Sequence, residues 1–269
     1  MRYLKRSKTQ TRALDQLLSG EVHIGLSFIP GDIIHIDAGA PVVILAGSHV
    51  GCVELVGGNR VRSTRELKGK TVATSQPGSD EQVFISMFVA HVGLNPQKDV
   101  NWVIHPWVDQ MRLFSEGKID AFMNGPPFSQ EMRAKRIGHV LVNTTTDKPW
   151  SQYFCCMVAS TKEFVRRHPV ATKRALRAIL KAADVCALEP DRTARLLADR
   201  GLSPSEDYTL QMLKEIPYGR WREYDPEDAV RFYALWMREV GMIKSSPQKI
   251  IAQGTDWRFL NELKKELKG

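Results

Sequence analysis

The most constraining feature of the sequence is an internal repeat with an offset of 97 residues. The segments LLSGEVHIGLSFIP (17–30) and FSEGKIDAFMNGPP (114–127) both show a helix end, a glycine, a charged residue, a short apolar strand and a turn. Gly20 aligns with Gly117, where a glycine is the expected helix C-cap. In the same register 42–45 falls on 139–142, which predicts a second strand in each copy. The repeat therefore predicts two lobes that share one architecture.

The second copy extends further than the first on its N-terminal side. A strand at 71–76, a helix from about Asp80 to Val92 and a strand at 100–105 precede it. Apolar residues follow the 3–4 residue spacing of an amphipathic helix over that middle segment. MRYLKR (1–6) matches the strand at 100–105, and no residues are left for the earlier elements. We therefore expect a first lobe shortened by truncation or by a start codon placed too late.

Strands that alternate with helices predict parallel sheets with crossover helices. Two extended segments, 51–58 and 153–160, are expected to join the lobes as a two-strand hinge. The predicted fold class is α/β, with two Rossmann-like lobes and this hinge. The first lobe is predicted to be discontinuous, at residues 1–70 and 154–269, and the second lobe to span 71–153.

The last third of the chain is predicted to be helical. Helices are expected at 170–188, 191–200 and 225–240. Asp225 is the expected N-cap of the third of these, with Pro226 in its first turn. Its predicted apolar face carries Val230, Tyr233, Trp236, Met237 and Val240.

Composition and charge exclude several classes of protein. Among 269 residues, 43% are hydrophobic and 25% charged, which is globular composition, and no apolar run reaches the roughly 20 residues of a membrane span. The net charge of +8 comes largely from basic stretches at 2–12 and 166–181 without a nucleic-acid-binding motif. We interpret them as solvated helix faces and expect no nucleic-acid partner. The first residues show no export signal.

The ends of the predicted strands indicate where a ligand would bind, because ligands of open parallel sheets bind beyond the carboxyl ends of the strands. The candidate ligand-binding residues are Phe28, Ser48, His49, Gly78, Ser79, Trp107 and Asn124. Facing lobes would gather these loops in one cleft, with Trp107 and Phe28 as stacking surfaces.

The turn SQPGSDEQ (75–82) allows two interpretations. Gly78 and Ser79 precede a helix, whose N-terminal N–H groups and dipole can hold an anion. Asp80 and Glu81 already complement that dipole, so a full anion is disfavoured and a polar group remains. A plain helix start is the equally weighted alternative.

Metal-binding and catalytic patterns are missing from the sequence. Cys52, Cys155, Cys156 and Cys186 form no CxxC pair, and the seven histidines form no HxxxH pair. Cys155 and Cys156 are adjacent, so in a strand they are expected to point to opposite faces, as partly buried thiols. His49 lies near Cys52 and Glu54, but we assign these three to packing or ligand polarity. The sequence thus predicts no enzyme, no metal and no cofactor.

Several motifs resemble those of a known family. The segments LLSGEVHIGLSF, APVVILAG, RSTRELKGKTVATSQPGS, FSEGKIDAFM and VASTKEFVRRHPVATKRALRAIL are similar to the solute-binding proteins of ABC importers for nitrate, sulfonates, taurine and thiamine precursors. RELKGKTVA and the strand followed by KEFVRRHP are the more specific marks. The resemblance covers essentially the whole chain. It implies a periplasmic-binding-protein fold of the second type, normally with an N-terminal strand, helix and export signal.

The resemblance also implies a function. It implies a monomeric, periplasmic and non-catalytic protein that captures a small polar organic solute or oxyanion between its lobes and delivers it to a membrane permease. Asp80 and Glu81 depart from the small-residue turn of the sulfonate binders, which favours an amine-bearing or heteroaromatic solute.

Two alternatives stay open. Thiamine-pyrimidine synthases resemble these binders and carry a cysteine-rich run on the returning strand, where this chain has FCCMV (154–158). The effector-sensing domain of a transcription regulator shares the two-lobe clamp.

Overall fold

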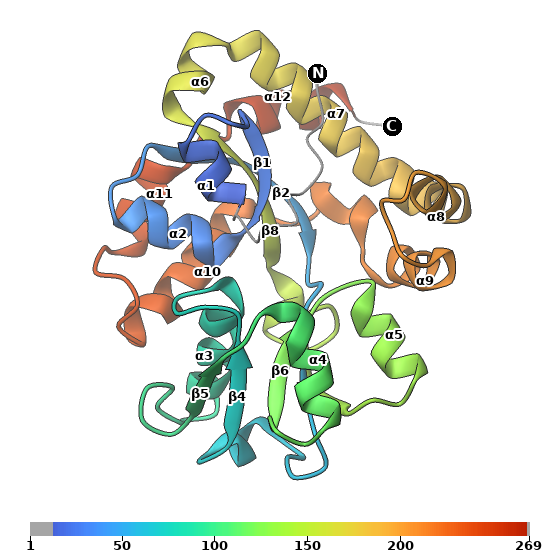
Figure 1. Ribbon diagram of the computed structural model, residues 1–269. Coiled ribbons are helices and arrows are strands. Elements are labelled where there is room, and N and C mark those ends of the chain that lie inside the picture. The colour runs from blue at the N-terminus through green and yellow to red at the C-terminus, as the bar shows by residue number, and fades with distance from the viewer. Residues whose placement is uncertain (1–12, 268–269) are drawn as a thin grey trace. The chain divides into compact units, whose positions relative to one another are not determined.

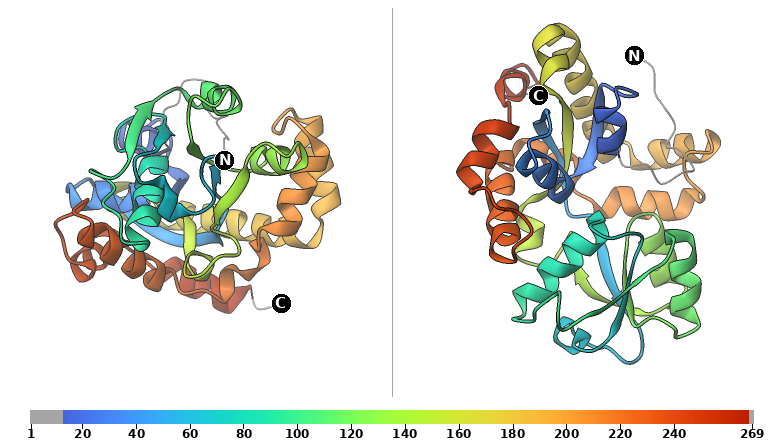
Figure 2. Two further views of the ribbon diagram at one scale, coloured as in Figure 1. Left: turned by 90° about the horizontal axis from the view of Figure 1, so that it is seen from below. Right: turned by 60° about the vertical axis from the view of Figure 1, so that its left-hand side comes forward.

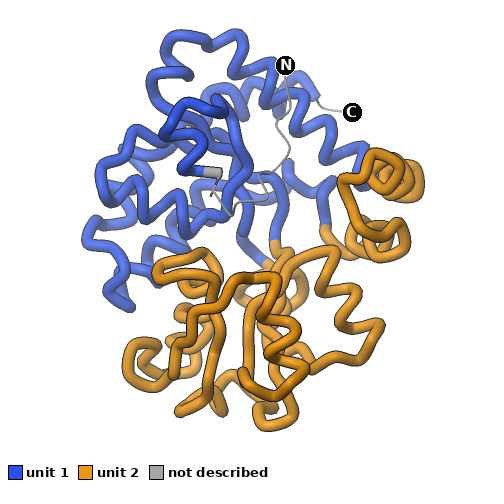
Figure 3. Tube along the Cα trace, viewed as in Figure 1, with its two compact units in different colours: residues 1–50, 152–188, 217–269 blue, residues 51–151, 189–216 orange. Residues whose placement is uncertain are grey.

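The computed structural model describes residues 13–267. The strand predicted in MRYLKR and the basic stretch at 2–12 lie outside the described residues. The described chain divides into two compact units (Figure 3). Unit 1 contains residues 13–50, 152–188 and 217–267, and unit 2 contains residues 51–151 and 189–216.

Unit 1 is built on a three-stranded sheet in the order β1-β8-β2 (Figure 1). Its strands are β1 (Ile24–Phe28), β8 (Phe154–Thr161) and β2 (Val42–Val50). Because β8 is antiparallel to both neighbours, β1 and β2 run parallel to each other. The helices of this unit are α1 (Ala13–Leu18), α2 (Ile29–Asp37), α6 (Lys162–Arg167), α7 (Pro169–Leu188), α10 (Pro226–Glu239), α11 (Pro247–Gly254), α12 (Arg258–Glu266) and the 3₁₀ turn η3 (Tyr218–Arg222).

Unit 2 is built on a five-stranded sheet in the order β5-β4-β6-β3-β7. Its strands are β3 (Glu54–Gly57), β4 (Thr71–Thr74), β5 (Asn101–Ile104), β6 (Ala121–Asn124) and β7 (His139–Asn143). β4 runs parallel to β5 and β6, whereas β3 is antiparallel to β6 and β7. The helices are α3 (Asp80–His91), α4 (Trp107–Ser115), α5 (Phe128–Ala134), α8 (Pro190–Asp199) and α9 (Glu206–Glu215), with 3₁₀ turns η1 (Thr64–Leu67) and η2 (Trp150–Gln152).

The predicted repeat is confirmed element by element. The order α1, Gly20, β1, α2, β2 recurs as α4, Gly117, β6, α5, β7. Both glycines have positive φ, 77° and 70°, which a glycine at a helix C-terminus adopts without strain. The prediction of parallel sheets is wrong at one point in each unit, because the sheet inserts an antiparallel strand between the repeated pair. That strand is β8 in unit 1 and β3 in unit 2.

The core of unit 2 lies on both faces of its sheet. Leu113 and Phe114 of α4 and Met132 of α5 pack against Val56, Ala73 and Phe122. α3 lies on the opposite side of the sheet from α4 and α5 (Figure 2). The predicted amphipathic character of α3 is wrong, because every residue from Val83 to Val89 is buried and the helix is a core helix.

The helices of unit 1 follow the predictions closely. The side chain of Asp225 accepts a hydrogen bond from the Glu227 N–H at the start of α10. Val230, Tyr233 and Met237 are fully buried on the predicted apolar face. The basic stretch at 166–181 lies in α6 and α7, where Lys173 and Arg177 pair with Glu266 of α12. These ion pairs lie on solvated helix faces, as the sequence predicted.

The division into units differs from the predicted lobes at two places. Residues 51–70 belong to unit 2, because β3 hydrogen-bonds to β6 and β7. Residues 189–216 also belong to unit 2, where Arg133 of α5 forms an ion pair with Glu215 of α9. Both segments join unit 2 through partners distant in sequence, which local patterns do not reveal.

We expect Gly47→Ala to destabilise the protein. A Cβ at Gly47 in β2 would lie 2.3 Å from the ring of Phe154 in β8, which is fully buried. Overpacking of this kind lowers the free energy of unfolding by about 1–3 kcal/mol. Gly125→Ala is the control, because a Cβ there meets no atom within 4 Å. Equal denaturant midpoints for the two variants would contradict the described packing of β2 on β8.

Candidate functional site

The carboxyl ends of three strands of unit 2 meet at one edge of its sheet, because β4, β5 and β6 are parallel. This edge carries Gly78 and Ser79 after β4, Trp107 after β5 and Asn124 at the end of β6. All four were predicted from the sequence, and their gathering at one edge within unit 2 is confirmed. We call this the carboxyl edge of unit 2.

Trp107 forms the aromatic part of this edge. It is the first residue of α4, is half-buried, and meets the ring of Phe128 edge-on with a centroid distance of 4.6 Å. Ile104 and Val108 beside it are exposed, Val108 by 74%. The edge therefore presents an apolar and aromatic surface. Its two aromatic rings are positioned by the first residues of α4 and α5, since Phe128 begins α5.

The turn before α3 is a capped helix start. Ser79 is the N-cap, and its Oγ accepts a hydrogen bond from the Gln82 N–H at 3.3 Å. The Gly78 N–H in turn donates to Gln82 Oε1 at 2.6 Å. Asp80 and Glu81 occupy the first turn, where they complement the helix dipole. The geometry fits the plain helix start, and contact of Gly78 and Ser79 with a solute stays a prediction.

Asn124 shapes the loop that follows β6. It is buried, its Nδ2 group donates to Met132 Sδ at 2.9 Å, and its Oδ1 accepts from the Gly125 N–H at 2.9 Å. The amide is thus tied to its own loop and to α5. Its contact with a solute also stays a prediction.

Glu54 is a further member of the carboxyl edge, and the sequence indicated for it only a role in packing or ligand polarity. It is the first residue of β3 and pairs with Asn124 on one side and Asn143 on the other. Because β3 runs antiparallel, its first residue lies where its neighbours end. The side chain is only 4% exposed, and Arg133 donates to its Oε1. A single acid whose cationic partner is 79 residues away gives no local sequence signal.

Glu54 is one of the residues that line a cavity of about 210 Å³. Its second oxygen, Oε2, and the Nε2 atom of His139 are both buried and have no hydrogen-bond partner among the described residues. Both residues line the cavity, together with Arg133 and Arg136. Burial raises the pKa of Glu54 above its ordinary value, and the opposing effect of Arg133 does not cancel this, partly because Glu215 adds negative charge.

In unit 1 the parallel strands β1 and β2 also end at one edge. Phe28 ends β1 and precedes α2, while Ser48 and His49 lie near the end of β2. Phe28 is half-buried and the other two are buried. The His49 ring meets Tyr218 of η3 edge-on at 5.0 Å. The predicted residues of unit 1 therefore all lie at the edge of the sheet where β1 and β2 end. Their contacts with a solute stay predictions.

The cysteine pair in β8 differs from the prediction. Cys155 Sγ lies 3.4 Å from Cys156 Sγ, so the two side chains do not point to opposite faces. A register shift between β2 and β8 is the cause: His49 pairs with Cys156 and Val50 with Phe154, which leaves Cys155 as an extra residue. The predicted thiol state is confirmed, since neither cysteine is part of a disulfide.

Solved structures of periplasmic binding proteins share this fold. The nitrate-binding protein NrtA of Synechocystis matches with a TM-score of 0.79, covering 95% of this chain and 78% of that chain at 17% identity. The alkanesulfonate-binding protein SsuA of Xanthomonas axonopodis, bound to MOPS, matches with a TM-score of 0.70, covering 91% and 83% at 16% identity. These likenesses confirm the predicted fold class.

A family model described as NMT1-like matches residues 4–201. The chain belongs to the NMT1-like family. Among its relatives, the bicarbonate-binding protein CmpA of Synechococcus elongatus is 25% identical over 126 residues, which are 46% of this chain and 28% of CmpA. This NMT1-like chain therefore matches little more than a quarter of the length of that relative.

NrtA, SsuA and CmpA are all named as binding proteins. The sequence of this NMT1-like protein agrees with that role, since it carries no recognised catalytic motif. None of the helices within residues 13–267 combines the length and apolarity that a membrane crossing requires.

We expect Arg133→Met to destabilise the protein more at pH 8 than at pH 5. The variant leaves a buried carboxylate without its cation, a loss of up to about 3–5 kcal/mol. Because the pKa of Glu54 is raised in the folded protein, protonation of its carboxyl group stabilises the folded state. This stabilisation is fully present below the ordinary carboxyl pKa and is lost as the pH rises through the raised pKa. At pH 5, protonation of Glu54 therefore reduces the free energy of unfolding that the Arg133→Met variant loses.

Two variants make this measurement specific. Arg136→Met removes an exposed cation that lines the same cavity, and its free energy of unfolding should change little at either pH. In Glu54→Gln/Arg133→Met the pH dependence of the loss should disappear. Chemical denaturation at both pH values provides the free energies. A double variant that keeps the full pH dependence would show that Glu54 is not the titrating group.

Proposed function

We propose that this NMT1-like protein is the solute-binding component of an ABC importer. In this proposal it works in the periplasm as a monomer, captures a small polar organic solute or oxyanion, and delivers it to a membrane permease. One observation carries the proposal: the family match over residues 4–201 coincides with a fold whose parallel strands end in a shared, partly aromatic edge. NrtA, SsuA and CmpA, named for binding nitrate, alkanesulfonates and bicarbonate, support it.

Trp107 is the residue that we assign to solute contact first. Its indole is half-buried at the carboxyl edge and contacts the ring of Phe128 edge-on. A ring held in this way offers a rigid face for stacking at little cost in conformational entropy. We assign Phe28 the corresponding role in unit 1, where it follows β1 directly.

The charges of the carboxyl edge favour a solute that brings hydrogen-bond donors. Asp80 and Glu81 lie in the first turn of α3, and Glu54 presents a buried oxygen, Oε2, without a partner among the described residues. A free oxyanion would meet the carboxyl groups of Asp80 and Glu81, whereas Arg133 is already paired with Glu54. An amine or a protonated ring nitrogen would instead donate to them, so we propose an amine-bearing or heteroaromatic solute over a simple oxyanion.

The remaining predicted residues have supporting roles in this proposal. Gly78, Ser79 and Asn124 hydrogen-bond within their own loops, and we propose that they fix the loop backbone against which the solute lies. Ser48 and His49 are proposed to line the edge of unit 1.

A thermal-shift screen of the purified chain tests the proposed function. The panel contains pyrimidines, small amines, sulfonates, nitrate and bicarbonate. A solute at a hundredfold excess over its Kd stabilises the folded state by about 2.7 kcal/mol, which corresponds to a rise in Tm of about 5–10 °C for a chain of this size. No stabilisation by any member of the panel would argue against the proposed solute classes.

We expect Trp107→Ala to weaken binding of the best solute about tenfold or more, because the stacking face and its buried apolar area are lost. The Tm without solute should fall by only a few degrees, since Trp107 is half-buried at a helix start. Val170→Ala is the control and should keep the wild-type affinity, because Val170 is 64% exposed and belongs to α7 of unit 1. Isothermal titration gives both affinities, and wild-type affinity in Trp107→Ala would place the solute elsewhere.

A further inference from the structure

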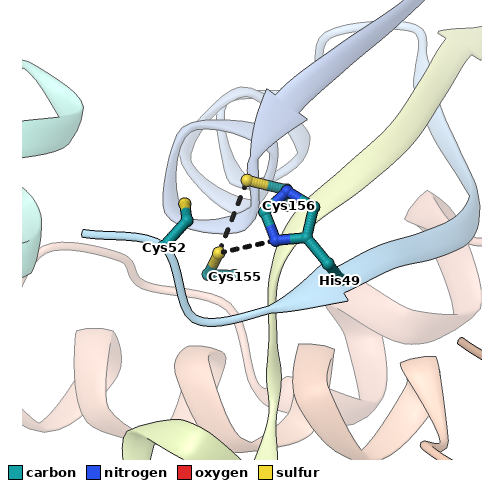
Figure 4. A group of neighbouring side chains, drawn as sticks. All are labelled: His49, Cys52, Cys155 and Cys156. Atoms are coloured by element: carbon teal, nitrogen blue, oxygen red, sulfur yellow. Dashed lines mark hydrogen bonds between the residues drawn. The ribbon is translucent and has the colours of Figure 1, made fainter. Parts of the chain in front are cut away.

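Metal-binding side chains gather where the end of β2 pairs with the start of β8, and one more lies two residues after β2. Cys155 Sγ lies 3.9 Å from His49 Nδ1 and 3.4 Å from Cys156 Sγ (Figure 4). Cys52 follows His49 by three residues on the same stretch of chain, so the covalent chain keeps its thiol near. The ligand atoms of all four residues lie within 4.8 Å of one another. We call these four residues the His–Cys cluster.

The register shift in the sheet creates this cluster. In a regular strand the side chains of consecutive residues point to opposite faces, and the two sulfur atoms would lie far apart. Here Cys155 is the extra residue between the pairs His49–Cys156 and Val50–Phe154. A bulge turns one side chain out of the regular alternation, and bulges are frequent beside functional sites. The irregular strand thus brings two adjacent thiols to the same imidazole.

The spacing of the ligand atoms suits a tetrahedral metal centre. With Zn–S bonds of about 2.3 Å and Zn–N bonds of about 2.0–2.1 Å, tetrahedral angles place two sulfur atoms about 3.8 Å apart and a sulfur and a nitrogen about 3.6 Å apart. The observed sulfur–sulfur distance of 3.4 Å is somewhat shorter than the ideal value, and the observed sulfur–nitrogen distance of 3.9 Å is somewhat longer. Shifts of a few tenths of an ångström would bring these two pairs to ligand positions, and the remaining pairs, all within 4.8 Å, would need to close by at most about 1 Å.

The surroundings of the cluster also favour a bound cation over solvated thiols. His49, Cys52 and Cys155 are buried, and Cys156 is half-buried. Phe154 and Met157, on either side of the cysteine pair, are fully buried. An apolar shell limits the access of water, and the Tyr218 ring packs on the imidazole of His49 and restrains its orientation.

We propose that the His–Cys cluster binds one zinc ion through three thiolates and the imidazole of His49. Thiolate and imidazole ligands in tetrahedral geometry select zinc over hard cations such as Mg²⁺ or Ca²⁺. The ion would tie the end of β2 to the start of β8. This assignment gives His49 a metal-binding role in place of solute contact, and it stands independently of the proposed transport function, because it needs no solute.

Zinc loading under reducing conditions tests the proposal. The purified full-length chain is incubated with a phosphine reductant and zinc chloride, passed through gel filtration, and analysed for metal content. We expect one zinc per chain, and a rise in Tm on zinc addition that a chelator reverses. Replacement by Co²⁺ should give the visible absorption bands of a tetrahedral cobalt thiolate. Wild-type protein that retains no zinc and shows no such cobalt spectrum would overturn the assignment.

Variants identify the ligands. Cys155→Ser, Cys156→Ser and His49→Gln should each weaken zinc binding at least about 10–100-fold in competition with a chromogenic chelator. Cys186→Ser is the matched control, because Cys186 lies on α7, outside the cluster, and is also half-buried. Zinc affinity that falls in Cys186→Ser but not in the cluster variants would contradict the proposal. If Cys155→Ser fails to fold, the cobalt spectrum of the wild-type protein still tests the proposal.

Discussion

The organisation of both units depends on one strand that runs against its two neighbours. β8 hydrogen-bonds to β1 and β2, and β3 hydrogen-bonds to β6 and β7, in each case antiparallel on both sides. Each central strand therefore fixes the register of a repeated pair that has no direct hydrogen bonds of its own. It also begins at the edge where that pair ends. The first residues of β3 and β8 are consequently placed among the strand ends, where ligands of this class of fold bind.

The chemically distinctive residues of the chain occur at these two starting points. Glu54 begins β3 in unit 2, and Cys155 and Cys156 follow the first residue of β8 in unit 1. Each is buried or half-buried beside a polar partner from another element, Arg133 for the carboxyl group and His49 for the thiols. The repeat thus provides two equivalent positions, and the chain has used them for different chemistry: a carboxyl group with a raised pKa and a set of soft metal ligands.

Local patterns in the sequence predicted the elements well and their long-range pairing less well. Gly20 and Gly117 marked the repeated helix ends, and Asp225 marked the start of α10, because caps and turns are determined by neighbouring residues. The strand ends at Trp107 and Asn124 were also predicted. The antiparallel placement of β3 and the membership of α8 and α9 in unit 2 depend on long-range contacts. The hydrogen bonds and ion pairs of Arg133 with Glu54 and Glu215, for example, join residues about 80 positions apart in the sequence. The bulge at Cys155 was equally invisible, since it arises from the register with β2.

The central claim is that a solute binds at the carboxyl edge of unit 2, and hydrogen–deuterium exchange with and without the best solute of the screen tests it most directly. Backbone amides that a solute covers or fixes exchange more slowly. The account predicts slower exchange in the segments after β4, β5 and β6, at residues 75–79, 105–108 and 124–128, and unchanged exchange in α12. Slower exchange confined to α12, or to other segments away from the strand ends, would contradict it.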